Sequence, residues 1–299
     1  MKRLIVIEGP TASGKTALGV ELAHYFNTVV ISADSRQFYK ELSIGTAKPS
    51  VEEQDGIHHY FVDSHNLTDE LTSATYAKEV DTLVKELFQK HDILLMVGGS
   101  GMFIDAFCIG LDNIPNSPEM REVLNKRFEL DGLTPLLEEL ADKDPEYFNF
   151  VDRSNPVRII RALEAISISG KTMSELRTQS VKKHDFDIKR FVINHPRPVL
   201  YDRINLRVDL MIENGLLEEV RSVTKFKHLN VLKTVGYSEL FRSMEGEISL
   251  ERAIELIKQN TRRYAKRQIT WFKRHSDAVW LENSDLPNMK SEVLYYLVD

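Results

Sequence analysis

Cysteine and long apolar runs are the two clearest shortages of this chain of 299 residues. Its single cysteine, Cys108, can form neither an internal disulfide framework nor a cysteine-based zinc site, and we expect it to be buried and inert in a reducing compartment, the cytoplasm. The longest apolar runs, residues 4–7 and 93–97, are far shorter than the ~20 residues of a membrane helix. We therefore expect no membrane span and, after the Met-Lys-Arg start, no secretory signal.

The chain also lacks an excess of basic residues. It has 39 Lys and Arg against 45 Asp and Glu, a formal net charge of −6, which excludes a uniformly basic, histone-like protein. A local basic face would still suffice to bind nucleic acid. With 42% hydrophobic and 28% charged residues, the chain has the composition of a globular protein that can bury a core. It has no internal repeat and no sustained heptad, and we expect a monomer.

Short apolar strands alternate with helices along most of the chain. We expect strands at residues 4–7, 28–32 and 93–97, with helices after position 16 and over 74–90 between them. A further strand is expected at 191–194, helices at about 200–225 and 250–274, a shorter helix through Gly236 and Tyr237, and an edge strand at 278–281. This alternation predicts an α/β fold in which helices flank a parallel sheet.

A helical insertion interrupts the alternation. Pro115, Asn116, Ser117 and Pro118 form a linker-like break, and the residues from there to 183 have helical patterns without a strong strand. We therefore divide the chain into a catalytic core, residues 1–116 and 184–299, and a helical insertion subdomain, residues 117–183, which we expect to contact RNA.

A complete G-x-x-x-x-G-K-[ST] motif lies between the first strand and the first helix. Its glycines let backbone N–H groups converge on an anion, and the N-terminus of the helix adds its dipole. The lysine adds a full positive charge, and the last hydroxyl can bind a phosphate oxygen or Mg²⁺. We expect a fold of the P-loop NTPase type with a phosphate- or diphosphate-binding loop made of Gly9, Pro10, Thr11, Ala12, Ser13, Gly14, Lys15 and Thr16.

The strand expected at 93–97 ends in Gly98, Gly99, Ser100 and Gly101, without a carboxylate. Kinases and nucleoside triphosphatases usually have an acidic residue at such a strand end, where it holds Mg²⁺. The sequence therefore favours a substrate whose diphosphate is the leaving group over a γ-phosphoryl donor.

Asp34 directly follows the strand expected at 28–32. The carboxyl ends of parallel strands form the ligand crevice in such sheets, so Asp34 should face the same crevice as Lys15. There it can accept a proton or hold Mg²⁺; a cap for the next turn is the alternative.

Several segments together resemble the tRNA dimethylallyltransferases, also called isopentenyl-tRNA transferases. They follow the family's order over nearly the whole chain, and the resemblance implies the bacterial type, without the zinc module of some eukaryotic members. Besides the phosphate loop, they are residues 34–37 (DSRQ) with Tyr39, 45–49 (GTAKP), 58–59, 98–101, 155–164, 215–220, 235–239 and 264–271.

The resemblance implies transfer of a dimethylallyl group from dimethylallyl diphosphate to N6 of the adenine 3′-adjacent to the anticodon, in tRNAs that read codons beginning with U. Asp34 is then the general base, and Lys15 and Thr16, with Mg²⁺ as cofactor, stabilise the departing diphosphate. The implied partners are dimethylallyl diphosphate and the anticodon stem-loop of tRNA. The residues expected at the substrate or the tRNA are Thr11, Asp34, Ser35, Arg36, Gln37, Lys48, Ser100, Arg158 and Arg161. Surface salt bridges are the alternative for the two arginines, for example between Arg161 and Glu164, and a solvated loop lysine is the alternative for Lys48.

A basic helix is expected near the end of the chain. Residues 251–275 contain eight basic and two acidic residues, a net charge of +6. Apolar residues occupy one face of this helix and basic residues another, a pattern suited to following RNA phosphates. An ordinary solvated face is the alternative. The residues expected to contact tRNA here are Arg263, Lys266 and Arg267.

Other functions stay open. A related transferase acting on free AMP, ADP or ATP, a nucleoside or small-molecule kinase with Asp34 as base, and a protein that only binds RNA or nucleotide all share the phosphate loop. Two positions depart from the family pattern: Phe103 stands where a tyrosine is expected, and Lys233 where arginine or glutamine is expected. The pair His58 and His59 has no metal-ligand spacing and is assigned no metal.

Overall fold

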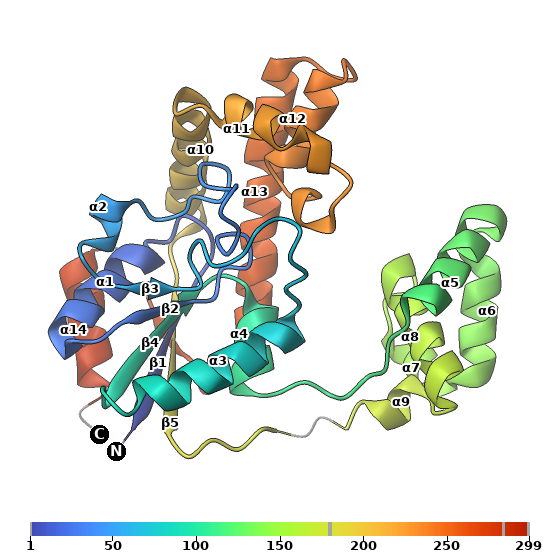
Figure 1. The fold of residues 1–299 in the computed structure, drawn as a ribbon, viewed down its shortest axis with the longest axis horizontal. Helices are drawn as coiled ribbons and strands as arrows, with labels where there is room; N and C mark the ends of the chain where they lie inside the picture. Colours follow the sequence, from blue (N-terminus) through green and yellow to red (C-terminus); the bar gives the residue numbers. More distant parts are fainter. Residues whose placement is uncertain (1, 179–180, 283–284, 298–299) are drawn as a thin grey trace. The chain divides into compact units, whose positions relative to one another are not determined.

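The computed structural model describes residues 2–178, 181–282 and 285–297. Its sheet has six strands, all parallel, in the order β3-β2-β4-β1-β5-β6 (Figure 1). The predicted α/β fold with a parallel sheet flanked by helices is therefore confirmed. The strands are β1 (Arg3–Glu8), β2 (Val30–Ser32), β3 (His59–Tyr60), β4 (Ile93–Gly98), β5 (Asp187–Ile193) and β6 (Val279–Leu281).

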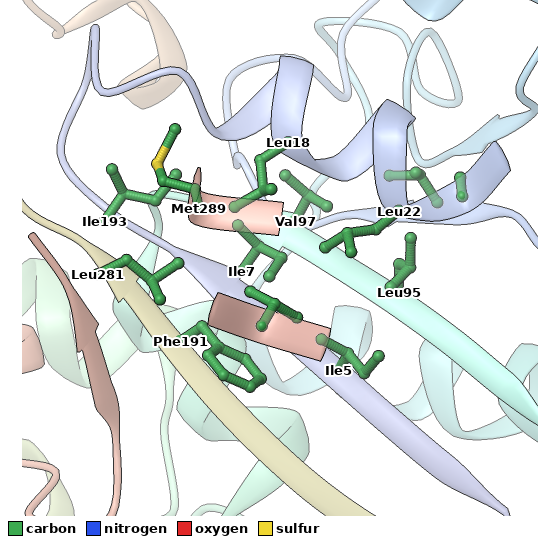
Figure 2. Close-up of a cluster of buried hydrophobic side chains, with 13 residues drawn as sticks. Ile5, Ile7, Leu18, Leu22, Leu95, Val97, Phe191, Ile193, Leu281 and Met289 are labelled. Carbon is green, nitrogen blue, oxygen red and sulfur yellow. The ribbon is translucent and has the colours of Figure 1, made fainter. Parts of the chain in front are cut away.

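The sheet is buried because its central strands are almost continuously apolar. Alternate residues of a strand point to opposite faces, and Ile5 and Ile7 of β1 pack against Leu18 and Leu22 of α1 (Lys15–Phe26). Figure 2 shows this cluster, in which Met289 of α14 (Leu286–Tyr295) closes the same layer. The core thus fixes α1, and with it the phosphate loop, against the carboxyl end of β1.

Helices α3 (Ser73–Leu87) and α4 (Gly101–Cys108) contact each other and belong to the same unit as the sheet. The hydroxyl of Tyr76 in α3 donates to the carbonyl of Ser32 at 2.9 Å, which anchors α3 beside the end of β2. Cys108 is buried, as expected. Helix α4 was not predicted, because the glycines before it indicate a turn; α2 (Val51–Gln54) and β3 were missed because both are very short.

The helices after β5 differ from the prediction in one respect. A single helix over 200–225 was expected, but the structure has α10 (Arg197–Glu213) and α11 (Leu216–Ser222). Gly215, at a φ of 96°, separates them in a left-handed conformation that a helix cannot continue through. After two short 3₁₀ turns, η1 (Thr224–Phe226) and η2 (Asn230–Leu232), come α12 (Tyr237–Met244) and the expected long helix α13 (Leu250–Phe272). The predicted edge strand is β6, parallel to β5.

Residues 109–182 form a second unit, described here by itself. Among its described residues the regular elements are all helices: α5 (Pro118–Asp131), α6 (Thr134–Lys143), α7 (Pro145–Phe150), α8 (Pro156–Ser169) and α9 (Met173–Leu176). The unit starts at Ile109 rather than at the predicted residue 117, so the segment 109–116 before α5 also belongs to it. It has its own apolar core, built around Leu136, Leu140 and Leu163.

Helices able to cross a lipid bilayer are absent from the described ranges: none of them is both long and apolar enough.

Candidate active site

The phosphate loop has the backbone that its motif predicts. Gly14, at a φ of 93°, is the N-cap of α1, and it has no side chain to cap the first-turn N–H groups of that helix. A Cβ at Gly9 would lie 2.8 Å from the hydroxyl of Ser13, so only glycine fits there. The ammonium of Lys15 donates to the carbonyl of Pro10 at 3.0 Å, which curls its side chain back over the loop. N–H groups and an ammonium arranged in this way can bind an anion.

Two arginines of α10, which sequence analysis missed, also lie at this loop. A guanidinium nitrogen of Arg203 is 3.5 Å from the position of a Cβ at Gly14, and Arg207 donates to the hydroxyl of Thr11 at 3.5 Å. They are spaced four residues apart on a helix that follows β5, the neighbour of β1, and this spacing was the available signal.

The cations at the loop are partly removed from water. Burial lowers the pKa of Lys15 to about 8, although the charge of Asp34 opposes the shift. Burial also lowers the pKa of Arg207, and Asp34 again acts in the opposite sense. An anion bound here would offset the desolvation of both cations.

Asp34 leaves the end of β2 and opens into the same site. Its neighbour Ala33 is held by two backbone bonds: its N–H donates to Val97 O at 2.8 Å, and its carbonyl accepts from Ser100 N at 3.1 Å. Tyr264 of α13 lines the same cavity as Asp34. Burial first and the charge of Asp34 second raise the pKa of Tyr264 to about 12. That hydroxyl therefore stays protonated at neutral pH.

These groups line one cavity of about 1130 Å³. Its walls include Arg203, Arg207 and Tyr264, none of them predicted. The predicted residues that line it are Thr11, Ala12, Ser13, Gly14, Lys15, Thr16, Asp34, Ser35, Arg36, Gln37, Lys48 and Arg267. The predicted residues that do not line it are Gly9, Pro10, Ser100, Arg158, Arg161, Arg263 and Lys266.

Residues 43–48 form a rigid wall of the cavity. The carboxylate of Glu219 in α11 accepts from the N–H groups of Ser43 (2.8 Å), Ile44 (2.7 Å) and Gly45 (2.9 Å), and from the hydroxyl of Tyr237 (2.6 Å). Three successive N–H groups around one carboxylate fix the backbone of this segment. Neither Glu219 nor Tyr237 was predicted to have this role.

Three of the predicted contact residues hold this region together. Lys48 donates to Tyr39 O at 2.8 Å and pairs with Asp63, and its side chain is only 5% exposed. Gln37 donates to Ala47 O at 3.0 Å. The hydroxyl of Ser100, a residue 9% exposed, accepts from Ser35 N at 2.9 Å. Lys48 and Ser100 thus have structural partners.

The two arginines predicted in α8 have different surroundings. Arg161 donates to the carbonyls of Ile114 (2.8 Å) and Pro115 (2.7 Å) and pairs with the buried Glu164 at 2.9 Å. This is the salt bridge that was the alternative for Arg161. Arg158 is exposed.

The basic face of α13 is narrower than its charge count indicates. Arg263, Lys266 and Arg267 are exposed, whereas Arg262 donates to Asn205 at 2.6 Å and Lys258 pairs with Asp209. The opposite face is buried through Ala253, Ile257, Ala265, Gln268 and Phe272.

The remaining sequence candidates have local surroundings. Phe103 packs in an aromatic cluster with Phe38 and Tyr76. His59 contacts the carbonyl of Ile57 at 2.9 Å, and burial lowers its pKa. Lys233 is exposed at the rim of the cavity. Within the described part of the chain, no three His, Cys, Asp or Glu side chains group as a metal site.

Comparison with known proteins identifies the family. The sequence model of the IPP transferase family matches residues 37–275. The tRNA dimethylallyltransferase 1 of Bacteroides fragilis is 47% identical over 99% of this chain and 97% of its own length. The chain belongs to the tRNA dimethylallyltransferase family. It is therefore an enzyme, a transferase of that family, as the resemblance implied.

Solved structures of the family have the same fold. The tRNA isopentenylpyrophosphate transferase of Bacillus halodurans has a TM-score of 0.74 at 31% identity, covering 100% of this chain and 96% of that one. A eukaryotic dimethylallyltransferase acting on tRNA has a TM-score of 0.80 at 25% identity, covering 100% of this chain and 78% of that one.

Proposed function

We propose that this enzyme transfers the dimethylallyl group of dimethylallyl diphosphate to N6 of the adenine 3′-adjacent to the anticodon, in tRNAs that read codons beginning with U, and releases diphosphate. The observation that carries this proposal is a single cavity that contains a cationic phosphate loop and an opposing carboxylate. The family assignment and the printed names of the relatives support the choice of group and acceptor.

The phosphate loop would bind the diphosphate. In the transfer, the C1–O bond of the dimethylallyl group breaks, positive charge spreads over the allylic carbons, and negative charge grows on the departing oxygens. Lys15, Arg203, Arg207 and the first-turn N–H groups of α1 are fixed before the reaction, so they stabilise that charge without reorganising. This distribution of cations supports diphosphate as the leaving group.

Asp34 would accept the proton of the adenine amine. The nitrogen attacks C1, a C–N bond forms, and the proton passes to the carboxylate. The position of Asp34 beside Gly99, on the wall of the same cavity as the loop, supports this role.

Mg²⁺ would bind at Thr16. In phosphate sites this ion takes one or two protein ligands, substrate oxygens and several waters, a demand that one hydroxyl in the cavity can meet. When bound, Mg²⁺ neutralises developing charge on the diphosphate.

The RNA would lie along the exposed basic residues of α13, Arg263, Lys266 and Arg267, with residues 117–183 as a further contact region through Arg158. We propose that the enzyme acts on it as a monomer, in the cytoplasm.

The proposal is tested with labelled dimethylallyl diphosphate and Mg²⁺, offering unmodified tRNA, AMP and ATP separately. We expect label on tRNA alone. Label on a free nucleotide would instead indicate a nucleotide-directed transferase, and consumption of ATP without any label transfer would indicate a kinase. Binding of tRNA or nucleotide with neither reaction would leave a binding protein.

A further inference from the structure

One buried amide joins α13 to the phosphate loop and to the turn after β4. Gln268, 5% exposed, accepts at Oε1 from the N–H of Thr11 (2.9 Å) and donates from Nε2 to the carbonyl of Gly99 (2.8 Å). A backbone N–H can only donate and a carbonyl can only accept. A side chain that bonds to both Thr11 N–H and Gly99 O therefore needs one acceptor and one donor. A carboxamide supplies both, and a carboxylate or an ammonium does not.

Backbone bonds continue from this amide to both sides of Asp34. Ser100, next to Gly99, donates from its N–H to Ala33 O at 3.1 Å, and its hydroxyl accepts from Ser35 N at 2.9 Å. Ala33 and Ser35 flank Asp34 in the chain. The phosphate loop is therefore connected to the carboxylate through one side chain and one turn.

The groups packed around the Gln268 amide leave it one position. A Cβ at Gly99 would lie 2.4 Å from Nε2 of Gln268, 3.3 Å from the carbonyl of Gly9 and 3.6 Å from Oδ2 of Asp34. The amide, the loop and the carboxylate thus converge on the same point, where a side chain on residue 99 would displace the amide. A group held this tightly from several sides transmits a displacement instead of absorbing it.

Gln268 also lies on the helix with the exposed basic residues. Arg267 precedes it directly, and Arg263 and Lys266 lie five and two residues before it. A shift of α13 on contact with RNA would reach Thr11 and Gly99 through this amide.

We propose that Gln268 is a positioning residue for the transfer reaction: it sets the spacing between the bound diphosphate and Asp34, and it makes that spacing depend on α13. This inference rests on the proposed function. Misplacing reacting groups by ~1 Å costs on the order of 100-fold in rate. When the amine is out of line, water takes the dimethylallyl group: the C1–O bond to diphosphate breaks, a bond to the water oxygen forms, and the proton goes to solvent, giving dimethylallyl alcohol and diphosphate.

The test compares Gln268→Glu and Gln268→Met with the unaltered enzyme on unmodified tRNA. Glutamate keeps the acceptor for Thr11 but turns an oxygen toward the carbonyl of Gly99, and methionine removes both bonds. We expect kcat to fall about 10–100-fold, with KM for dimethylallyl diphosphate and Kd for tRNA within about threefold. Diphosphate release should exceed label transfer, with the difference recovered as dimethylallyl alcohol.

The matched control is Asn260→Ala. Asn260 is a second amide of α13, partly buried; it donates to Glu239 at 2.7 Å and accepts from Arg263 at 3.2 Å, and both contacts lie away from the phosphate loop. This variant should keep the kcat of the unaltered enzyme and a one-to-one ratio of diphosphate to transferred label. If both Gln268 variants fail to fold, Gly99→Ala displaces the same amide from the other side and should uncouple release from transfer.

Two results would overturn the inference. One is a fall in kcat with a one-to-one ratio in every variant, which would indicate a loss of folded enzyme only. The other is an unchanged kcat in Gln268→Met. Failure of the proposed function is distinguishable, because the unaltered enzyme would then transfer no label to tRNA at all.

Discussion

Two groups of basic residues, one in each unit of this enzyme, have opposite surroundings. In residues 109–182, Arg121 and Arg161 both pair at 2.9 Å with Glu164, whose side chain is fully buried. In the other unit, Lys15 and Arg207 gather at the phosphate loop, where their contacts are a carbonyl and a hydroxyl. The first group is neutralised inside the protein. The second lies near the charges of Asp34 and, for Arg207, Glu53, but burial outweighs them and lowers the pKa values of Lys15 and Arg207.

This difference separates structural from functional cations. Partly desolvated cations without a matching set of carboxylates are unfavourable unless an anion joins them, and they cluster at binding sites for that reason. A cation that already faces a buried carboxylate has no such need. The sequence shows the same residue types in both units, and only the partners distinguish them.

Replacing Asp34 should have the largest effect. Asp34→Asn removes the proton acceptor but keeps the shape of the side chain, so turnover should fall at least ~100-fold. Binding of tRNA should change little. Single-turnover transfer and a filter-binding titration measure the two quantities, and near-normal turnover would remove Asp34 from its role as base.

The second prediction concerns the two arginines that pair with Glu164. Glu164→Gln removes the charge that Arg121 and Arg161 face, and it should lower the free energy of unfolding by roughly 2 kcal/mol, less than for a fully buried pair because both arginines are partly exposed. Urea unfolding measures this loss, with Arg158→Gln, an exposed arginine of the same helix, as the control that should leave it unchanged.

The carboxylate of Glu164 should also make the free energy of unfolding fall at acid pH. Burial alone raises the pKa of Glu164, but the N–H of Ser117 and the guanidinium groups of Arg121 and Arg161 outweigh it, and the pKa is lower than its usual value of 4.5. The stabilisation is therefore complete above about pH 4.5 and is lost as the pH falls through the lowered value. Glu164→Gln should flatten this part of the pH profile, and an unchanged slope would contradict the prediction.

The third prediction compares one arginine from each group. Arg207→Gln removes a cation from the proposed diphosphate site, and KM for dimethylallyl diphosphate should rise about tenfold. Arg121→Gln, in the other unit, should leave that KM unchanged. Steady-state kinetics at saturating tRNA measure KM for dimethylallyl diphosphate in both variants. An equal rise in both would contradict the division into structural and functional cations.

Diphosphate affinity should also depend on pH through Lys15. Because its pKa is about 8, the Lys15 side chain is charged below that pH and loses its charge as the pH rises above it. Affinity for inorganic diphosphate should therefore weaken above about pH 8 in the free enzyme. Lys15→Arg, whose charge persists, should lose this weakening in the same calorimetric titration; a decline that persists in the variant would assign it to another group.

The smallest effect is expected on the outer face of α13. Neutralising Arg263 and Arg267 together should weaken tRNA binding and reduce the slope of log K against log salt concentration by about 2. Neutralising Arg252, which pairs with Glu255 at the start of the same helix, is the control and should leave that slope nearly unchanged. A normal slope in the double variant would place the RNA elsewhere.

Patterns over short stretches predicted much of the fold. The central strands, α1, α3 and α13 were predicted because an apolar run or a helical face is a property of neighbouring residues. The break at Gly215 was missed because the surrounding residues favour a helix and only one backbone angle interrupts it. Helix α4 was missed for the opposite reason: its first residue, Gly101, and the residues 98–100 before it have the composition of a turn.

Sequence by itself determined the phosphate loop, the acid after the second strand and the family, because each is encoded in contiguous residues. Tertiary structure alone decided which distant residues meet them. Arg203 and Arg207 reach the loop because β5 lies beside β1, and Gln268 reaches it because α13 packs its apolar face inward. The partners of a charged or amide side chain are fixed by the packing of elements far apart in the chain, and no local pattern contains that information.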